Sequence, residues 1–388
     1  QKLALAFERL PADSPELSGA WSLKAASYVW DSDTVRAAEA ARKALQIARE
    51  RGSFQHLGPA YEALTHPALM GVLGRELHEL SDEWVALARE RPEDRQMLFK
   101  ALTARGLVHV WAFWEFDETL QVEMLEALEI ARATQSTADD NTVRGILGAG
   151  RFLLGEWTAA EADLRRAAGQ STTLVGVGAI YEWWLMLLLT LRGEIESAAE
   201  QMTAWLEDTA NTHRQVLMHA LLGFNRFLAG DDDAARAAIA QGSEVAAALN
   251  CAQCDVTLHM LAAETLAELG DEDGAASHAK LARDGGERFG RQAASIAADR
   301  AEAVLALRDS RIDHARQLLE RARRQAEALQ QPFEVARTLL VQARLHEASG
   351  NDFAAVPVRE QAQAMLTALG CPVGSRLVRS RSGPPRRA

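Results

Sequence analysis

The chain has 388 residues, of which 48% are hydrophobic and 6% aromatic, and its formal net charge at pH 7 is −12. This acidic balance argues against a broad face for nucleic acid, which needs clustered Lys and Arg. The longest uncharged apolar run, from Trp183 to Leu191, is far shorter than the ~20 residues of a membrane-spanning helix. The three cysteines make no disulfide framework, so we expect a cytoplasmic protein without a membrane segment.

The first 17 residues predict the end of a preceding helix or an N-terminal cap, because residues 1–10 already have a helical pattern. The chain starts at Gln1 without a Met, which indicates a piece cut from a longer protein. A region of internal repeats then runs from residue 18 to residue 370.

A turn signal recurs through this region every 37 to 42 residues. The anchors of the repeats are Ser32, Gly74, Phe116, Gly155, Gly193, Gly230, Gly270, Ser310 and Gly350. Five positions after the anchor the residue is Ala in seven of the nine units, and twelve positions after it the residue is Ala in six. Self-similarity at this period predicts stacked supersecondary units, each packed on its neighbours, instead of a globule with one central core.

Each unit has the pattern of a helix, a turn and a second helix. In residues 142–154 the apolar and small residues fall at the three- and four-residue spacing of a helix face. Gly155 then ends the helix, and Glu156 begins the next one with an acid near its positive end. Small residues seven before, five after and twelve after each anchor allow close approach of the helices. We therefore predict an all-α, right-handed superhelical solenoid of about nine helix-turn-helix repeats.

The last segment, residues 371–388, predicts a disordered basic tail. Its final thirteen residues contain five arginines, no acid, and several Ser, Gly and Pro residues. Such a tail is either a solvated terminus or a contact for an acidic partner or nucleic acid.

The small residues at these offsets resemble the tetratricopeptide repeat, over roughly residues 18–370. The period is longer than the usual ~34 residues, the Trp, Tyr and Pro signature positions are mostly absent, and repeats two and three are degenerate. Longer, Ala- and Arg-rich repeats of this style are similar to the C-terminal sensor region of MalT-like regulators, whose ATPases belong to the STAND class. Similar arrays follow the ATPase of some nucleotidyl cyclases. The most similar stretches begin at Leu10 and Pro332.

The same resemblance implies a ligand-binding groove. First helices of tetratricopeptide repeats line a concave surface, so residues ten, six and three before each anchor would face it. The aromatic candidates at or beside these positions are Trp111, Phe113, Trp114, Phe152, Trp183, Trp184, Phe224 and Phe227. Arg151, Arg226 and Arg300 would lie near the same groove and offer contacts to carboxylates or phosphates. The alternative is that the aromatic residues fill the core where repeat three has lost its small residues.

Catalytic and metal-binding patterns are weak. Cys251 and Cys254, with His259, have the spacing that starts a zinc site, but no second Cys pair supplies the remaining ligands, which favours buried thiols. The glycine-rich stretch from Gly145 to Gly150 is interpreted as a helix contact. The chain has no HExxH motif, no phosphate loop ending in Gly-Lys-Ser/Thr and no evident acid–base pair. We expect no enzyme activity, no cofactor and no metal.

The expected function is therefore a non-catalytic, protein- or ligand-binding regulatory module of a larger bacterial signalling ATPase or transcriptional regulator. Its partner would be a protein, a peptide or a small-molecule inducer, with an ATPase domain as neighbour in the parent protein. The alternatives are a constitutive scaffold for protein–protein interaction and an accessory region of a nucleotidyl cyclase.

Overall fold

The computed structural model describes residues 2–30, 33–71, 74, 76–170, 178–207, 212–249 and 251–372. These residues form helices and turns, and no strand occurs among them. None of the described helices combines the length and apolarity that crossing a membrane requires. Residues 373–388 of the predicted basic tail lie outside the described residues, and the division of the chain into cap, solenoid and tail stays a prediction.

The helices follow one another with short turns. In chain order they are α1 (Lys2–Arg9), α2 (Glu16–Trp30), α3 (Thr34–Glu50), α4 (Phe54–Leu69), α5 (Glu76–Arg89), α6 (Arg95–Leu107), the π-helical η1 (Val108–Phe113), α7 (Glu118–Thr134), α8 (Thr137–Leu154), α9 (Trp157–Ala167), α10 (Gly178–Leu191), α11 (Ile195–Leu206), α12 (Thr212–Ala229), α13 (Asp232–Ala248), α14 (Ala252–Leu269), α15 (Glu272–Phe289), α16 (Gln292–Arg308), α17 (Ile312–Ala328), α18 (Pro332–Ala348) and α19 (Asp352–Ala368).

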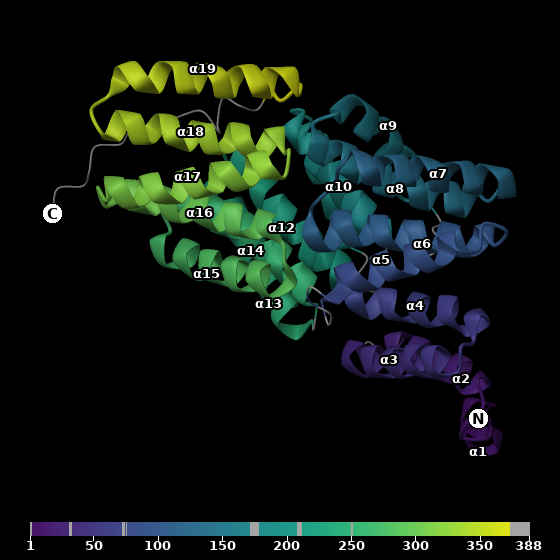
Figure 1. Ribbon diagram of the computed structural model, residues 1–388. Helices are drawn as coiled ribbons and strands as arrows, with labels where there is room; N and C mark the ends of the chain where they lie inside the picture. Colours follow the sequence, from purple (N-terminus) through teal and green to yellow (C-terminus); the bar gives the residue numbers. More distant parts are fainter. Residues whose placement is uncertain are drawn as a thin grey trace.

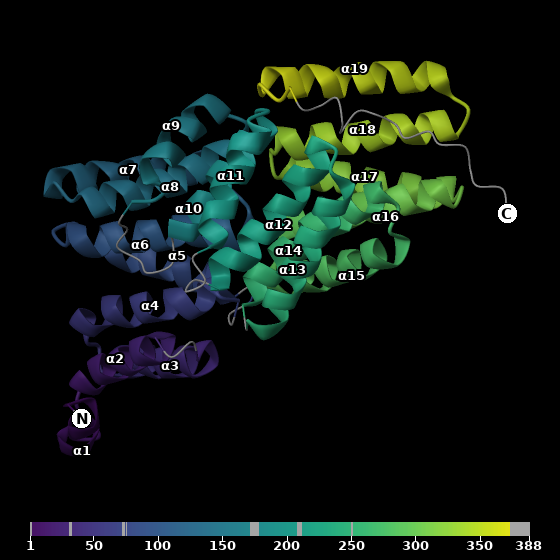
Figure 2. The ribbon, with the colours of Figure 1, turned by 180° about the vertical axis from the view of Figure 1, so that it is seen from behind.

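From α2 onward the helices pair as predicted, from α2 with α3 to α18 with α19, and in the third pair α6 continues into η1. Every anchor within the described residues lies in the turn between the two helices of its pair, while Ser32 lies outside them. Figure 1 shows the purple-to-blue N-terminal pairs stacked beside the green-to-yellow C-terminal pairs, and Figure 2 shows α10 to α13 at the junction of the two stacks. The predicted all-α solenoid of helix-turn-helix units is confirmed.

Small residues set the distance between paired helices. A Cβ atom on Gly148 of α8 would lie 2.6 Å from Leu164 Cγ and 3.1 Å from the carbonyl oxygen of Ala160, both on α9. Gly145 and Gly150 face Tyr181 and Phe116 in the same way, so this glycine-rich stretch is a packing surface, as predicted. α8 ends at Gly155, whose φ of +84° is the left-handed conformation that favours glycine.

The solenoid closes on itself along a seam of three helix N-termini. Cys251, Arg291 and Gln331 are the N-cap residues of α14, α16 and α18, spaced 40 residues apart, and each is at most 1% exposed. Beside Cys251, the backbone N–H of Ala252 donates to the carbonyl of Met70 at the end of α4 (3.1 Å). Arg291 donates to carbonyls at the end of η1, and Gln331 Nε2 donates to the carbonyl of Trp114, the residue that caps η1 (2.5 Å). The C-terminal repeats are thus fastened to the N-terminal ones.

Of the three seam residues, Arg291 has the largest set of hydrogen bonds. Its guanidinium donates to the carbonyls of Ala112 (3.0 Å) and Trp111 (2.5 Å), and also to Thr257 Oγ1 (2.8 Å) and Gln253 Oε1 (2.5 Å). The last carbonyls of a helix lack partners within it and attract positive charge, so a cation suits the end of η1. Burial lowers the pKa of Arg291 to about 9, which still leaves the group charged at neutral pH.

The small-residue packing is testable with two alanine substitutions. Gly148→Ala forces a methyl group against α9 and is expected to lower the free energy of unfolding by about 1–2 kcal/mol, because overpacking outweighs the gain in helix propensity. The control is Gly19→Ala in α2, where the new Cβ would make an ordinary 3.5 Å contact with His56. Urea denaturation measures both; equal effects would refute the packing role of Gly148.

The seam is testable through Arg291→Met. The change leaves two buried carbonyls unsatisfied, so we expect a loss of about 3–5 kcal/mol in the free energy of unfolding. Small-angle X-ray scattering should also show a larger radius of gyration as the two stacks separate. Arg311→Met is the matched control, since Arg311 is the N-cap of α17 and its ion pair with Asp309 is about half exposed. An unchanged radius and a loss below about 1 kcal/mol would contradict a closing role.

Candidate functional site

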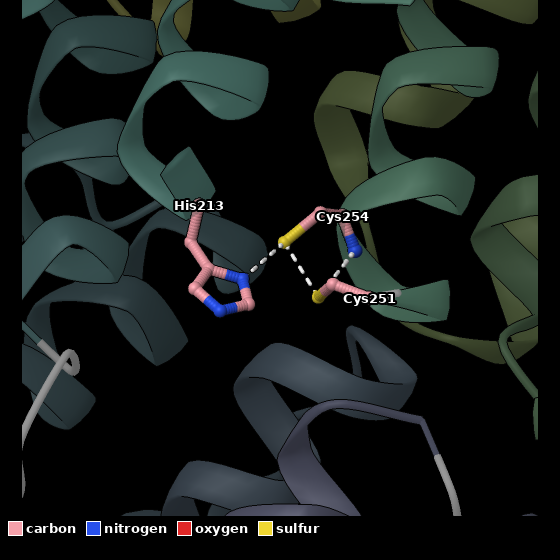
Figure 3. A group of neighbouring side chains, drawn as sticks. All are labelled: His213, Cys251 and Cys254. Carbon is pink, nitrogen blue, oxygen red and sulfur yellow. Dashed lines mark hydrogen bonds between the residues drawn. The ribbon is translucent and has the colours of Figure 1, made fainter. Parts of the chain in front are cut away.

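The Cys251–Cys254 pair is buried, as its sequence context predicts, and neither thiol is in a disulfide. The two Sγ atoms lie 2.7 Å apart, and Cys254 Sγ lies 3.5 Å from His213 Nδ1 (Figure 3). His259, the histidine that follows the pair in sequence, instead meets His278, with 2.9 Å between their Nδ1 atoms. The histidine beside the thiols is therefore one that sequence spacing did not suggest.

The aromatic residues proposed for the groove lie inside the molecule. Each of these residues is 6% exposed or less, and Trp183 and Trp184 are fully buried. Trp114 and Phe152 pack on Trp184 with ring centroids 4.9 and 5.2 Å apart. The remaining members of the predicted set are Trp111, Phe113, Phe224 and Phe227. At Trp183 and Trp184 the structure has the alternative arrangement, a core between repeats, because the seam closes the concave side there. Contact of any of these residues with a ligand stays a prediction.

Two of the three predicted arginines, Arg151 and Arg226, pair with carboxylates on second helices. Arg151 on α8 donates to the carboxylate of Asp163 on α9 and lies 3.7 Å from Glu156. Arg226 on α12 lies 3.3 Å from Glu196 at the start of α11, the neighbouring repeat. Arg151 therefore contacts a carboxylate within its repeat, whereas Arg226 links two repeats, and neither borders the hollows lined by the predicted aromatic residues.

An open hollow does remain on the first helices of the last four repeats. We call it the α12–α18 groove, and it is lined by Phe224, Phe227, Glu264, Glu268, Arg300, Val304, Arg337, Leu340, Val341 and Arg344. A second hollow, bordered by Trp114 and Phe152, adjoins it and shares Phe224 and Arg337. Four members of the predicted aromatic set thus border open space.

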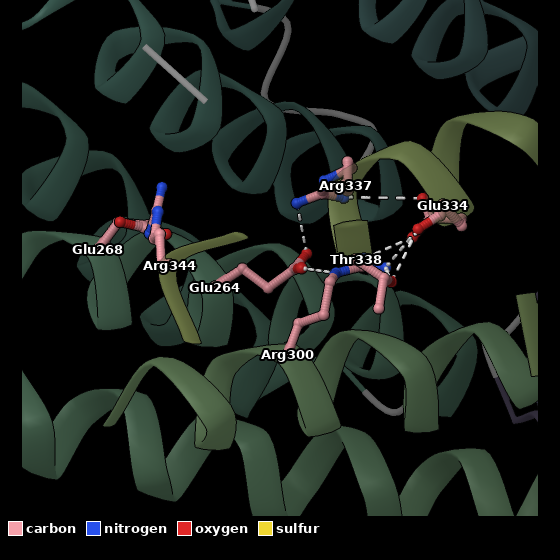
Figure 4. A network of polar contacts seen from close by, with 7 residues as sticks. All are labelled: Glu264, Glu268, Arg300, Glu334, Arg337, Thr338 and Arg344. Atoms are coloured by element: carbon pink, nitrogen blue, oxygen red, sulfur yellow. Dashed lines mark hydrogen bonds and ion pairs between the residues drawn. The ribbon is translucent and has the colours of Figure 1, made fainter. Parts of the chain in front are cut away.

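Arginine–glutamate pairs form one wall of the groove (Figure 4). Glu264 accepts from Arg300 Nε (2.6 Å) and from Arg337 Nη2 (2.7 Å). Glu334 accepts from Arg300 and lies 3.6 Å from Arg337 Nη1. These four residues join α14, α16 and α18 into one charged network.

A separate pair lies beside this network. Arg344 Nη1 donates to Glu268 Oε1 (2.5 Å), and the two side chains are 16% and 25% exposed, whereas that of Arg300 is only 3% exposed. The carboxylate of Glu268 is therefore the one that an incoming group can most readily replace.

The network holds its charges despite burial. Burial opposes the charge of Arg300, but the carboxylates of Glu264 and Glu334 raise its pKa above the ordinary value. Burial alone would raise the pKa of Glu334, but Arg300 and Arg337 lower it below the ordinary 4.5. The guanidinium of Arg337 also lies over the rings of Phe224 (5.7 Å) and Phe333 (5.4 Å). A wall of cations beside aromatic rings can recognise a carboxylate next to an apolar group.

Sequence reasoning named Arg300 but missed most of this network. Glu264 and Arg344 lie six residues before the anchors Gly270 and Gly350, the same offset that singled out Phe224. Applying that offset to charged residues as well as aromatic ones would have identified them.

No protein-family model matches the chain, and no curated protein matches it. Among solved structures, the Rap protein complexed with Competence and Sporulation Factor is 9% identical, with a TM-score of 0.64 over 92% of this chain and 99% of that one. Yeast Tom70 is 15% identical, with a TM-score of 0.37 over 96% of this chain and 91% of that one. The likeness to the Rap protein shows a shared fold, a tetratricopeptide-like helical solenoid.

The network makes stability depend on pH. Arg300→Leu removes the central cation and is expected to cost about 3–5 kcal/mol in the free energy of unfolding at pH 7. Because the pKa of Glu334 is lowered on folding, its contribution is present above pH 4.5 and is lost as the pH falls through the folded value. The penalty of Arg300→Leu should therefore shrink below pH 4.5. Urea denaturation between pH 3 and 7 tests this, with Arg324→Leu on the exposed side of α17 as control; a penalty independent of pH would contradict it.

Proposed function

We propose that this chain is a non-catalytic module that binds a segment of a protein or peptide in the α12–α18 groove. The observation that carries the proposal is the partly exposed pair of Arg344 and Glu268 beside an apolar floor of Val304, Leu340 and Val341. Arginine and aromatic residues are the usual anchors of interfaces.

The chemistry of the ligand follows from the groove. A carboxylate on the partner can replace Glu268 on Arg344, forming the bidentate pair that arginine favours. Glu264 and Glu334 are too buried and too strongly paired to leave. A neighbouring apolar side chain of the partner would contact Leu340 and the edge of Phe227. We therefore expect a segment in which an apolar residue lies close to an Asp, a Glu or a C-terminal carboxylate.

The lining of the groove favours a protein segment over a small-molecule inducer. Its lining residues come from four first helices, α12, α14, α16 and α18. Arg337 of α18 lies over the ring of Phe224 on α12, 5.7 Å away, so these helices curve around a hollow of side-chain width. Such a hollow takes one or two side chains of a segment whose backbone passes over its mouth. The Rap protein of the similar fold was solved complexed with Competence and Sporulation Factor, which agrees with a solenoid of this kind binding a partner.

We further propose that binding is regulatory. The resemblance of the repeats to the sensor region of MalT-like regulators supports a parent protein with a STAND-class ATPase. A nucleotidyl cyclase as parent, or a constitutive scaffold with no effector domain, is the second candidate. The genomic neighbourhood of the coding sequence separates these cases, because an ATPase or cyclase encoded in the same reading frame supports a sensor, whereas its absence supports the scaffold.

The groove is tested by selecting random linear peptides of about ten residues, displayed on their own mRNA, against the full chain. Selected peptides should be acidic next to an apolar residue. Arg344→Gln should weaken their binding about 10- to 100-fold, because it removes a charge-assisted pair. Fluorescence anisotropy with labelled peptides measures the Kd.

Arg324→Gln, on the exposed side of α17, is the matched control and should leave the Kd unchanged. Replacing the acidic residue of the peptide by its amide should weaken binding to the wild type. The same replacement should cause little further loss of binding to Arg344→Gln. Thermal denaturation checks that both variants fold. Peptides that bind wild type and Arg344→Gln equally would refute the assignment of this groove.

A further inference from the structure

Three metal-ligating side chains meet at the first contact of the seam. A ring nitrogen of His213 and the Sγ atoms of Cys251 and Cys254 all lie within 4.8 Å of one another. His213 comes from the first turn of α12, and the two cysteines flank the start of α14 (Figure 3). Cys251 and Cys254 are 0% and 1% exposed, and the sulfur of Cys251 also accepts from the backbone N–H of Cys254.

A third helix, α4, packs against these three side chains. Met70, which caps the end of α4, has its Sδ 3.8 Å from Cys251 Sγ. His66 lies one helical turn before Met70 and therefore on the same face of α4. Its Nδ1 is buried without a hydrogen-bond partner among the described residues. His66 therefore lies on the side of α4 on which Met70 contacts Cys251.

The spacing of the donor atoms suits a tetrahedral ion. With Zn–S near 2.3 Å and Zn–N near 2.0–2.1 Å, ligand atoms in such a site lie about 3.5–3.8 Å apart. The distance of 3.5 Å between Cys254 Sγ and His213 Nδ1 meets this value. The 2.7 Å between the two sulfurs would widen by about 1 Å through side-chain rotation. Two cysteines at i and i+3 at a helix start are well placed for that adjustment.

Charge selects the ion. Two thiolates buried together carry two negative charges, which is costly without compensation. A divalent cation neutralises both, and with neutral imidazoles the site has no net charge. Zn²⁺ is the divalent ion that takes thiolate and imidazole ligands in a tetrahedral arrangement.

We propose that Cys251, Cys254 and His213, with His66 as the fourth ligand, form a zinc site that joins α4 to α12 and α14. Binding would release the two thiol protons, as Zn²⁺ replaces them on the sulfur atoms. The ion would fasten an N-terminal repeat to the C-terminal repeats at the place where Ala252 already bonds to Met70. The site is separate from the α12–α18 groove.

The test is titration of the reduced, metal-free full chain with Co²⁺ as a spectroscopic probe, followed by competition with Zn²⁺. We expect one ion per chain, thiolate-to-cobalt charge-transfer bands and the visible bands of a tetrahedral site. Zn²⁺ should raise the Tm, since a ligand of the folded state stabilises it. It should also slow hydrogen exchange in the last turn of α4, a readout that metal bound elsewhere would not give.

Single substitutions assign the ligands. Cys254→Ser and His213→Ala should weaken Co²⁺ binding by more than the roughly 10- to 100-fold that loss of an outer-shell partner costs. His66→Ala should weaken binding and change the visible bands. The matched controls are Cys371→Ser, a buried cysteine elsewhere, and His259→Ala, the histidine that pairs with His278. Both should bind as the wild type does.

Three results would overturn the proposal. One is the absence of charge-transfer bands in the reduced protein. Another is an equal loss of binding in His259→Ala and His213→Ala. The third is an unchanged spectrum and affinity in His66→Ala, which would remove the fourth ligand and with it the link to α4.

Discussion

The shape of this molecule depends on one buried cation. Arg291 has all four of its hydrogen bonds to neutral oxygens, two of them main-chain carbonyls at the end of η1, about 180 residues away in sequence. The cost of burying a guanidinium is met by these bonds together with the faces of Trp111 and Trp114, 5.7 and 5.4 Å away. An open solenoid has contacts only between neighbouring repeats. Here the eighth repeat is fastened to the third, so repeats that are far apart in the sequence are in direct contact.

This closure also decides which part of the molecule stays open to the solvent. The end of η1 and the aromatic residues around Trp183 and Trp184 are enclosed, so the middle of the concave side is core. In the part of the chain that the structure describes, a hollow remains farther along, where the first helices of the last four repeats continue beyond the seam. There the pair of Glu264 and Arg300, whose side chains are 10% and 3% exposed, lies beside the more exposed pair of Glu268 and Arg344, at 25% and 16%. The hollow in which we propose that a partner binds therefore lies beyond the enclosed aromatic residues.

The sequence predicted the repeats because their packing is local. Ala at fixed offsets from each anchor reports contacts between helices that are adjacent in the chain, and Gly148 against Leu164 is typical. The closure could not be predicted in this way, since it depends on pairs such as Arg291 with Trp111, whose proximity follows from the summed curvature of several repeats. For the same reason spacing suggested His259 as the partner of the cysteines, whereas the fold supplies His213 from another repeat.

Seam and groove are built on the same three helices. α14, α16 and α18 each begin with a seam residue, Cys251, Arg291 or Gln331, and each carries groove residues further along. On α16 the interval from Arg291 to Arg300 is nine residues, or about 13 Å along the axis. A helix is stiff over that distance, so a ligand that shifts α16 or α18 in the groove also shifts its N-terminus against the N-terminal repeats. A ligand that binds the closed arrangement more tightly than an open one would then stabilise the closure.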